Sequence, residues 1–350
     1  MQPEPIRIMA LALWAAAIAF SSPSAQGEVR VRTVAWNGWT GAVELVNAET
    51  RLVVVPAIGR IMHYSFADGE NVLWTDPALY GATTPTNGPA RDAAGNPAWV
   101  NFGGDKVWAN QQDEFASING YAWPPDPWFD GARQDSRLLP DGVVLTSPVS
   151  DFNGARCVRE IRLAATGTRV TIEQTIEKVR TGRRPELEPV RYTVWNVTQI
   201  RPPEQILFPL RADSVFTNGF RIYEGDPQAT ANFRAEDGVG LFRPDATGVS
   251  QKAGADGTPW LAAIVGDTVI AEFFRREEGR PYPDGGAGAK IYTCNDYTEL
   301  ELLSPLLPLK PGERLCHTIA WELHRLPPDA PTPDARRAAA LVWLRLAGTP

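Results

Sequence analysis

Two glutamates near the end of the chain are the first residues whose type and spacing suit acid/base chemistry. Glu299 and Glu301 stand in the segment Tyr297-Thr-Glu-Leu-Glu-Leu, ahead of a Pro-Gly turn and an apolar stretch. In an extended strand both glutamates point to one face and the leucines point to the other. Close, partly buried carboxylates raise the pKa of one of the pair, which makes a proton donor or acceptor. The alternative interpretation is a solvent-facing strand edge.

A cluster of tryptophans indicates a second kind of chemistry, the binding of sugars. Indole rings stack on the apolar C–H face of a sugar, while carboxylates, amides and ammonium groups hydrogen-bond its hydroxyls. The alternative is that the tryptophans only cover the core. The candidate substrate-binding residues are Lys106, Trp108, Gln112, Trp123, Asp126, Trp128 and Asp130, with Trp99 and Asp105 beside them.

His317 is the third catalytic candidate, after Glu301 and Glu299. It alternates with Leu315, Ile319 and Trp321, a pattern that favours a place in or beside an apolar layer. As an acid, it would have to reach the two glutamates from another strand. Proton transfer requires heavy atoms at roughly 2.6–3.2 Å.

The sequence contains none of the common motifs for metal, nucleotide or nucleophilic-serine chemistry. It contains no H-E-x-x-H, Walker loop, G-x-S-x-G or dinucleotide-binding fingerprint. Cys157, Cys294 and Cys316 lack the spacing of a zinc site, so we expect neither a metal nor a cofactor. The sequence is compatible both with a Cys294–Cys316 disulfide and with free thiols.

Composition narrows the class of protein. The 350 residues are 43% hydrophobic and include 12 Trp, 30 Gly and 31 Pro, which is typical of a globular chain of many strands and turns. The formal charge of −7 comes from 34 basic and 41 acidic residues, and the basic ones are scattered. Nucleic acid is therefore not an expected partner, and the oligomeric state stays open.

The elements that must position these residues are strands. Many short apolar runs recur with turn signals between them, and in Val170–Ile176 every second residue shares one face, which carries Val170, Ile172, Gln174 and Ile176, while the other face is polar. The sequence thus predicts an all-β fold, a large sandwich of antiparallel sheets over residues 28–326. Residues 327–350 form a Pro-rich linker and a short C-terminal helix, which either docks on the sandwich or stays loosely attached. Residues 75–137 read as one long loop.

The first 27 residues resemble a secretory signal peptide. Arg7 precedes an apolar run that ends at Phe20, followed by small and polar residues. The run is shorter than the roughly 20 apolar residues that span a bilayer. We therefore expect cleavage, a periplasmic or secreted protein, and no membrane span in the mature chain.

Three segments in order resemble galactose mutarotase-like domains of the aldose 1-epimerase superfamily, in an uncharacterised bacterial branch. They are Arg51-Leu-Val-Val-Val-Pro-Ala-Ile-Gly-Arg, Asn101-Phe-Gly-Gly-Asp-Lys-Val-Trp108, and the stretch 297–323 that ends near Trp321-Glu-Leu. The resemblance implies a β-supersandwich whose concave face binds a sugar. It implies a late glutamate as general base, Glu301 or Glu299, and Lys106 near the place of a substrate-binding Arg. The family's catalytic His has no counterpart in 193–199, which departs from the epimerase pattern.

These observations predict a carbohydrate-binding protein with a saccharide ligand in a Trp-rich cleft. An aldose 1-epimerase-like or other carbohydrate-active enzyme is the first alternative. A structural or interaction protein without a sugar ligand is the second.

Overall fold

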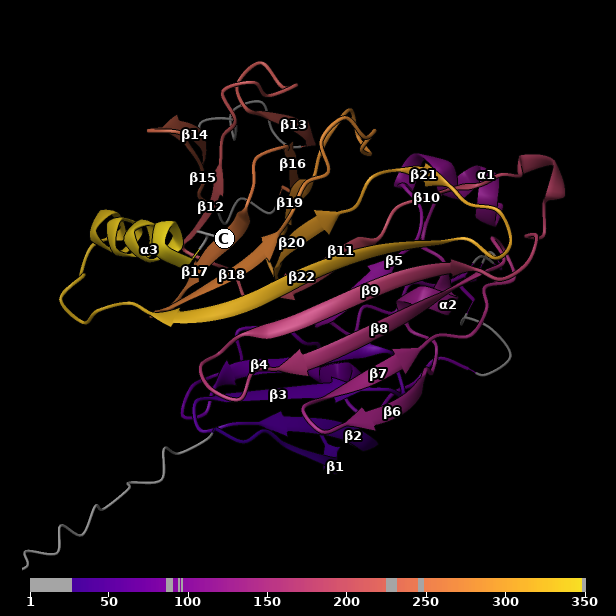
Figure 1. The fold of residues 1–350 in the computed structure, drawn as a ribbon, viewed down its shortest axis with the longest axis horizontal. Coiled ribbons are helices and arrows are strands. Elements are labelled where there is room, and N and C mark those ends of the chain that lie inside the picture. Colours follow the sequence, from indigo (N-terminus) through magenta and orange to yellow (C-terminus); the bar gives the residue numbers. More distant parts are fainter. Residues whose placement is uncertain are drawn as a thin grey trace, which may run out of the picture.

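Two large antiparallel sheets face each other in the computed structural model, which describes residues 27–85, 91–93, 95, 97–224, 232–244 and 249–347 (Figure 1). The first, called here the cleft sheet, has the spatial order β1 (Arg30–Trp36), β2 (Trp39–Val46), β3 (Thr50–Val55), β4 (Arg60–Phe66), β5 (Asp105–Trp108), β11 (Trp195–Ile200), β20 (Thr298–Leu303), β19 (Ala289–Thr293), β16 (Gln251–Ala255) and β13 (Phe220–Glu224).

The second sheet, called here the back sheet, lies across the core from the first. Its order is β14 (Phe233–Glu236), β15 (Val239–Phe242), β12 (Gln205–Pro209), β17 (Trp260–Val265), β18 (Thr268–Phe274), β22 (Arg314–Arg325), β9 (Val170–Lys178), β8 (Ala155–Leu163), β7 (Gly142–Thr146) and β6 (Asp135–Leu139). A small ladder joins β10 (Arg191–Tyr192) to β21 (Leu307–Pro308). The helical elements are α1 (Phe115–Asn119), α2 (Pro127–Asp130), α3 (Pro333–Ala347) and the short 3-10 turns η1 (Pro77–Leu79), η2 (Gln112–Glu114) and η3 (Pro185–Leu187). The all-β class, the antiparallel sheets and the C-terminal helix are confirmed.

Period-2 alternation decides which side chains face the core. In β9, Val170, Ile172 and Ile176 are buried against the other sheet, as the sequence pattern predicts. In β20, Leu300 and Leu302 join the same core, together with residues of the back sheet such as Ile319 and Trp321. Glu299 and Glu301 therefore leave β20 on its opposite face, away from the inter-sheet core.

Strand β5 was not predicted, because residues 75–137 read as a loop. Yet Asp105–Trp108 lies in the middle of the cleft sheet, between β4 and β11. Two glycines with positive φ, Gly103 and Gly104, lead into it. A Cβ on Gly104 would lie 2.3 Å from the Ile61 carbonyl oxygen, so only glycine lets β5 approach β4 this closely.

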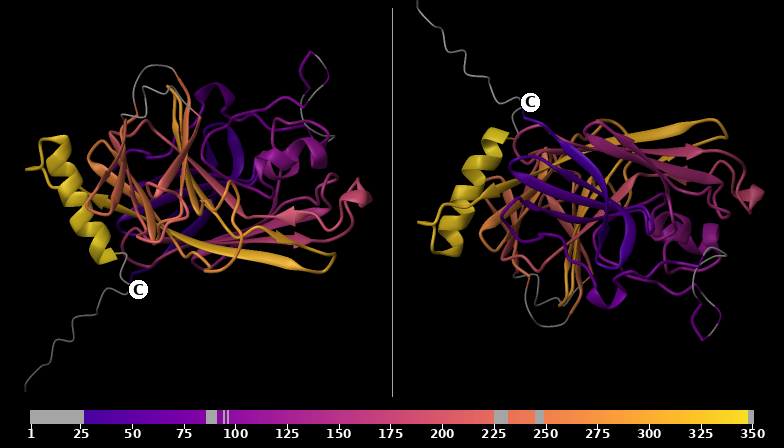
Figure 2. Two further views of the ribbon diagram at one scale, coloured as in Figure 1. Left: turned by 90° about the horizontal axis from the view of Figure 1, so that it is seen from above. Right: turned by 90° about the horizontal axis from the view of Figure 1, so that it is seen from below.

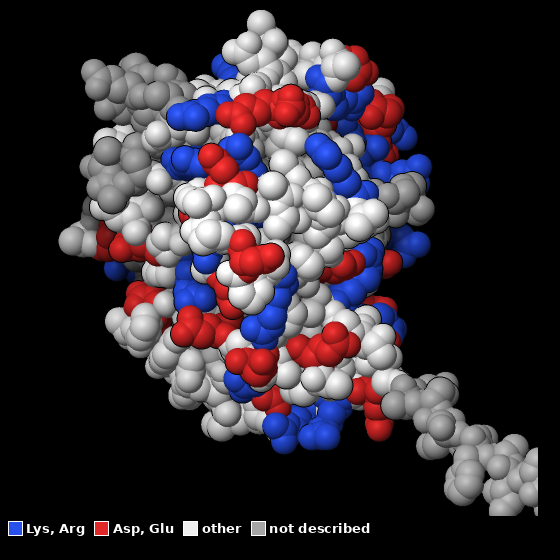
Figure 3. Space-filling view, turned by 90° about the vertical axis from the view of Figure 1, so that its left-hand side faces the viewer, with Lys and Arg blue, Asp and Glu red and all other residues white. Residues whose placement is uncertain are grey.

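Helix α3 packs on the outer face of the back sheet, which settles the choice left open by the sequence. Ala340 and Leu344 are fully buried there, and the Trp343 ring stacks on His324 with centroids 4.8 Å apart. Figures 1 and 2 show α3 at the opposite end of the molecule from α1 and α2. On the face seen in Figure 3, basic and acidic side chains are interspersed rather than separated.

The three cysteines are free thiols: Cys157 is buried, Cys294 half-buried and Cys316 exposed. The expected signal peptide, apart from Gly27, lies outside the described residues. Within the described ranges, no helix has the length and apolar character needed to cross a membrane.

Candidate functional site

Five neighbouring strands, β5, β11, β20, β19 and β16, place polar and ionisable side chains on the outer face of the cleft sheet. Across β5, β11, β20 and β19, Lys106 lies opposite Val197, Val197 opposite Glu301, and Glu301 opposite Lys290. A parallel row runs from Gln199 through Glu299 and Tyr292 to Lys252. Strand register thus brings together residues that are far apart in the sequence.

Lys106 and Glu299 form a buried ion pair in this group. The Lys106 ammonium lies 3.4 Å from Glu299 Oε1, and the Gln199 amide donates to the same oxygen at 2.9 Å. Burial raises the pKa of Glu299, with Lys106 opposing that rise, and burial lowers the pKa of Lys106. Burial thus disfavours both charges, and the ion pair offsets part of that cost.

Glu301 is held more tightly and is fully buried. The Trp195 indole donates to Glu301 Oε2 at 2.8 Å, and the Lys290 ammonium lies 3.3 Å from the same oxygen. Lys252 lies 3.9 Å from the other carboxylate oxygen. The ammonium nitrogens of both lysines also lie over the Trp195 ring, 3.6 Å from its centroid for Lys290 and 5.2 Å for Lys252. Of the two glutamates, Glu299 is the one at a cavity.

That cavity has a volume of about 190 Å³. Its lining consists of Trp99, Trp108, Gln112, Trp123, Lys252, Tyr292, Tyr297 and Glu299. Trp123 is 41% exposed, and its ring meets those of Trp99 and Trp108 edge to face, with centroids 5.1 and 6.0 Å away. The predicted residues Trp108, Gln112, Trp123 and Glu299 therefore meet at one cavity, and Lys106 lies directly behind Glu299.

Asp130 does not line this cavity, in contrast to the sequence interpretation. Its carboxylate accepts hydrogen bonds from the indoles of Trp99 at 3.0 Å and Trp108 at 2.7 Å, and it pairs with the buried Arg60 at 3.1 Å. With its oxygens so occupied, Asp130 orients two tryptophans of the cavity wall.

Asp126 and Trp128 lie outside the cavity as well. Asp126 caps α2 by accepting from the Trp128 amide at 3.0 Å, and it also accepts from the Ser150 hydroxyl. Burial raises the pKa of Asp126 to about 7. The Trp128 ring packs against a hydrophobic cluster around Val107 and Phe129. Both residues build the loop that carries Trp123.

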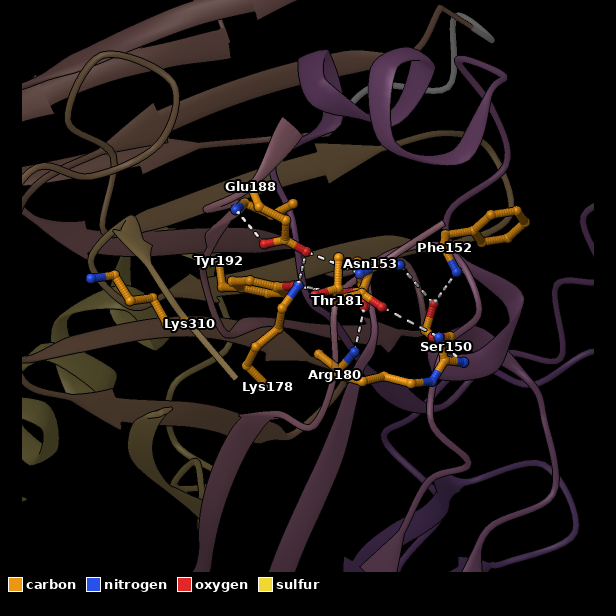
Figure 4. A network of polar contacts seen from close by, with 12 residues as sticks. Ser150, Phe152, Asn153, Lys178, Arg180, Thr181, Glu188, Tyr192 and Lys310 are labelled. Carbon is orange, nitrogen blue, oxygen red and sulfur yellow. Dashed lines mark hydrogen bonds and ion pairs between the residues drawn. The ribbon is translucent and has the colours of Figure 1, made fainter. Parts of the chain in front are cut away.

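A polar network around Asn153 and Lys178 lies at the end of strand β9 of the back sheet (Figure 4), and the Asn153 side chain connects it to Asn110, next to β5. The Asn153 amide donates to Asn110 at 3.0 Å, and the buried Lys178 donates to the Asn153 carbonyl at 2.7 Å and to Glu188 at 2.5 Å. The Tyr192 hydroxyl donates to the same Asn153 carbonyl at 2.7 Å. The contacts within this network are internal, which identifies it as a structural support.

His317 is not brought to the glutamates. It lies on β22 of the back sheet, where its side chain shares the inward face with Ile319 and Trp321, and burial lowers its pKa to about 4. The cleft sheet therefore separates it from Glu299. His63 contacts Ser65 on β4, and His324 contacts α3, so no histidine lines the cavity.

Sequence reasoning missed Lys252, Lys290, Tyr292 and Tyr297 as members of the site. Lys290 and Tyr292 alternate on the strand that precedes Glu299, and this pattern could have indicated that they share its face. The place of Lys252 could not be predicted in this way, because it depends on how a strand distant in the sequence pairs with β19. Among the described residues, no group of three His, Cys, Asp or Glu side chains is arranged to hold a metal ion.

Fold and site together define an all-β sandwich protein with an aromatic-walled, ionisable cavity on one sheet. The chain belongs to the family described as "Domain of unknown function (DUF4380)", whose model matches residues 41–324. No curated protein matches it.

The chain is similar to several solved structures. One is a TPR-domain containing protein from Parabacteroides distasonis, with 13% identity and a TM-score of 0.51; the match covers 83% of this chain and 48% of that one, so this chain spans about half its length. A galactose mutarotase-like protein from Clostridium acetobutylicum has 9% identity, a TM-score of 0.45 and coverages of 85% and 99%. Galactose 1-epimerase from Lactobacillus acidophilus has 11% identity, a TM-score of 0.43 and coverages of 86% and 99%. Mutarotase-like proteins are thus among its structural neighbours, as the sequence resemblance predicts.

Proposed function

We propose that this protein binds a saccharide in the cavity beside Glu299. The observation that carries the proposal is the combination of an exposed indole, Trp123, with the polar groups of Gln112, Lys252 and Glu299 around one small cavity. An aromatic face takes the C–H side of a sugar ring, and amide, ammonium and carboxylate groups satisfy its hydroxyls. The sequence pattern of residues 1–27 supports action in the periplasm or outside the cell.

Calorimetric titration with a panel of free sugars tests this proposal. Trp123→Ala should weaken binding of the best sugar by about tenfold, since an aromatic contact contributes up to about 1.5 kcal/mol. Trp343→Ala removes a half-buried indole from α3, on the outer face of the back sheet and away from the cavity, and should leave the affinity within about twofold. Equal losses in both variants, or no sugar bound by the wild type, would contradict the proposal.

Acid/base catalysis on the bound sugar is the second candidate, favoured by the raised pKa of Glu299 and its ion pair with Lys106. Because the cavity lacks a histidine, the phenols of Tyr292 and Tyr297 are the neutral acids in its wall, and burial raises the pKa of the Tyr297 phenol. Anomer interconversion needs a base at the anomeric hydroxyl and an acid at the ring oxygen.

Polarimetry of freshly dissolved aldoses distinguishes catalyst from binder. If Glu299 is the base, Glu299→Gln should retain binding, because an amide still hydrogen-bonds, and lose at least about 100-fold of the acceleration. Interconversion by the wild type no faster than in buffer, across several aldoses, would exclude the epimerase candidate and leave saccharide binding.

A further inference from the structure

Two exposed aromatic side chains stand apart from the rest. Tyr80 is 38% exposed and Trp123 is 41% exposed, whereas the other aromatic side chains in the described ranges are buried or half-buried. Aromatic rings are ordinarily buried, and exposed ones are enriched where ligands bind. Trp123 forms part of the cavity wall, whereas Tyr80 lies over Trp36 and Trp39, with ring centroids 5.9 Å from each.

Ring contacts run from the cavity as far as Trp74, and the next residue, Thr75, connects this segment to Tyr80. The cavity-lining Tyr292 and Tyr297 have centroids 6.2 Å apart, and Tyr297 contacts Trp74 at 4.7 Å. Trp74 is followed by Thr75, whose hydroxyl is hydrogen-bonded to the Tyr80 hydroxyl at 2.8 Å. We call Tyr297, Trp74 and Tyr80 the aromatic track.

Polar groups accompany this track. The Gln199 carbonyl accepts from the Trp74 amide at 2.9 Å, and the Gln199 side chain donates to Glu299. The side-chain oxygen of Gln199 has no hydrogen-bond partner in the protein. The Thr75 and Tyr80 hydroxyls are exposed. Gln199 is fully buried, so the groups of the track that a ligand can reach are its hydroxyls. Aromatic faces interspersed with hydroxyls suit a row of sugar rings.

The small volume of the cavity also favours a ligand that extends over the surface. Its 190 Å³ is below the roughly 300–1,000 Å³ of pockets for drug-sized ligands, so it holds one ring and little more. A longer ligand must leave it over the surface, where the half-buried Trp74 and the exposed Tyr80 of the aromatic track offer stacking faces.

We propose that the ligand is an oligosaccharide, with one ring in the cavity and further rings along the aromatic track to Tyr80. This inference rests on the proposed saccharide binding.

Calorimetry with uncharged gluco-, xylo- and galacto-oligosaccharides of one to four rings tests the inference. In the series that binds, we expect three rings to bind at least about tenfold tighter than one ring. Tyr80→Ala should remove most of that gain and leave the affinity for one ring within about twofold. Tyr80→Phe keeps the ring and should keep the gain. Leu138→Ala, an exposed apolar residue on β6 of the back sheet, is the matched control.

The outcomes separate the two proposals. Equal affinity at all lengths, or a length gain that Tyr80→Ala leaves intact, overturns the oligosaccharide inference while saccharide binding stands. Failure of every sugar at every length overturns both.

Discussion

At the scale of single residues, buried Asp126 gives folding a distinctive pH dependence. Its pKa is about 7 in the folded protein, whereas an unfolded aspartate titrates near about 4. Between these values the folded state holds a proton that the unfolded chain has lost, so rising pH removes stability across this window. Asp126→Asn removes this titration.

We therefore expect the unfolding free energy of the wild type to fall relative to that of Asp126→Asn as pH rises from 5 to 7, by up to about 1.4 kcal/mol per pH unit. Urea unfolding at several pH values measures the difference. Asp135→Asn, at an exposed position on β6, should show no such relative slope. Parallel curves for wild type and Asp126→Asn would contradict this account.

Residue types alone could not separate the ligand-facing polar groups from the structural ones. Asp126 and Asp130 lie among tryptophans in the sequence, as sugar-binding carboxylates do, but their oxygens are occupied by a hydroxyl, a backbone amide and indoles. Strand alternation did predict that Glu299 and Glu301 share a face. Which of them reaches a cavity depends on Trp195 and Lys290, whose positions follow from strand register.

At the scale of elements, the site depends on β5, which carries Lys106 and Trp108 into the cleft sheet. Gly104→Ala places a Cβ against the Ile61 carbonyl at a positive φ of 68°. We expect a loss of more than about 2 kcal/mol of unfolding free energy and weaker saccharide binding. Gly238→Ala, also at positive φ but with no atom within 4 Å of the added Cβ, should cost only about 1 kcal/mol.

Denaturant unfolding of both alanine variants measures these costs, and a Gly104→Ala variant no less stable than Gly238→Ala would contradict the argument.

The glycines before β5, Gly103 and Gly104, also explain why the sequence did not predict this strand. Four residues, two of them charged, bounded by Gly-Gly, carry no alternation long enough to indicate a strand. Longer strands such as β9 and β22 were predictable because their alternation persists.

At the scale of the whole molecule, helix α3 and the candidate cavity lie on opposite faces of the sandwich. Helix α3 covers the back sheet, and the candidate cavity opens on the cleft sheet. Leu344→Ala empties a fully buried position and should cost about 2–5 kcal/mol with saccharide affinity unchanged. Leu346→Ala, the same substitution at a 74% exposed position of the same helix, should stay within about 0.5 kcal/mol.

Thermal unfolding and calorimetric titration of the two leucine variants give both readouts. Weakened sugar binding in Leu344→Ala under conditions where it is folded would show that α3 is coupled to the cavity.

Because the candidate cavity opens on the cleft sheet, the exposed thiol of Cys316 on the back sheet is a suitable point for attaching the protein to a surface. Cys316 lies on β22 with its side chain directed outward from the back sheet, while Cys157 is buried. A maleimide–biotin reagent, with Cys294 replaced by serine, would attach the protein to a sensor chip through the back sheet. The attached protein would then present its cleft sheet to the flowing solution, so soluble glycans could be screened without the loss of sites that random coupling causes.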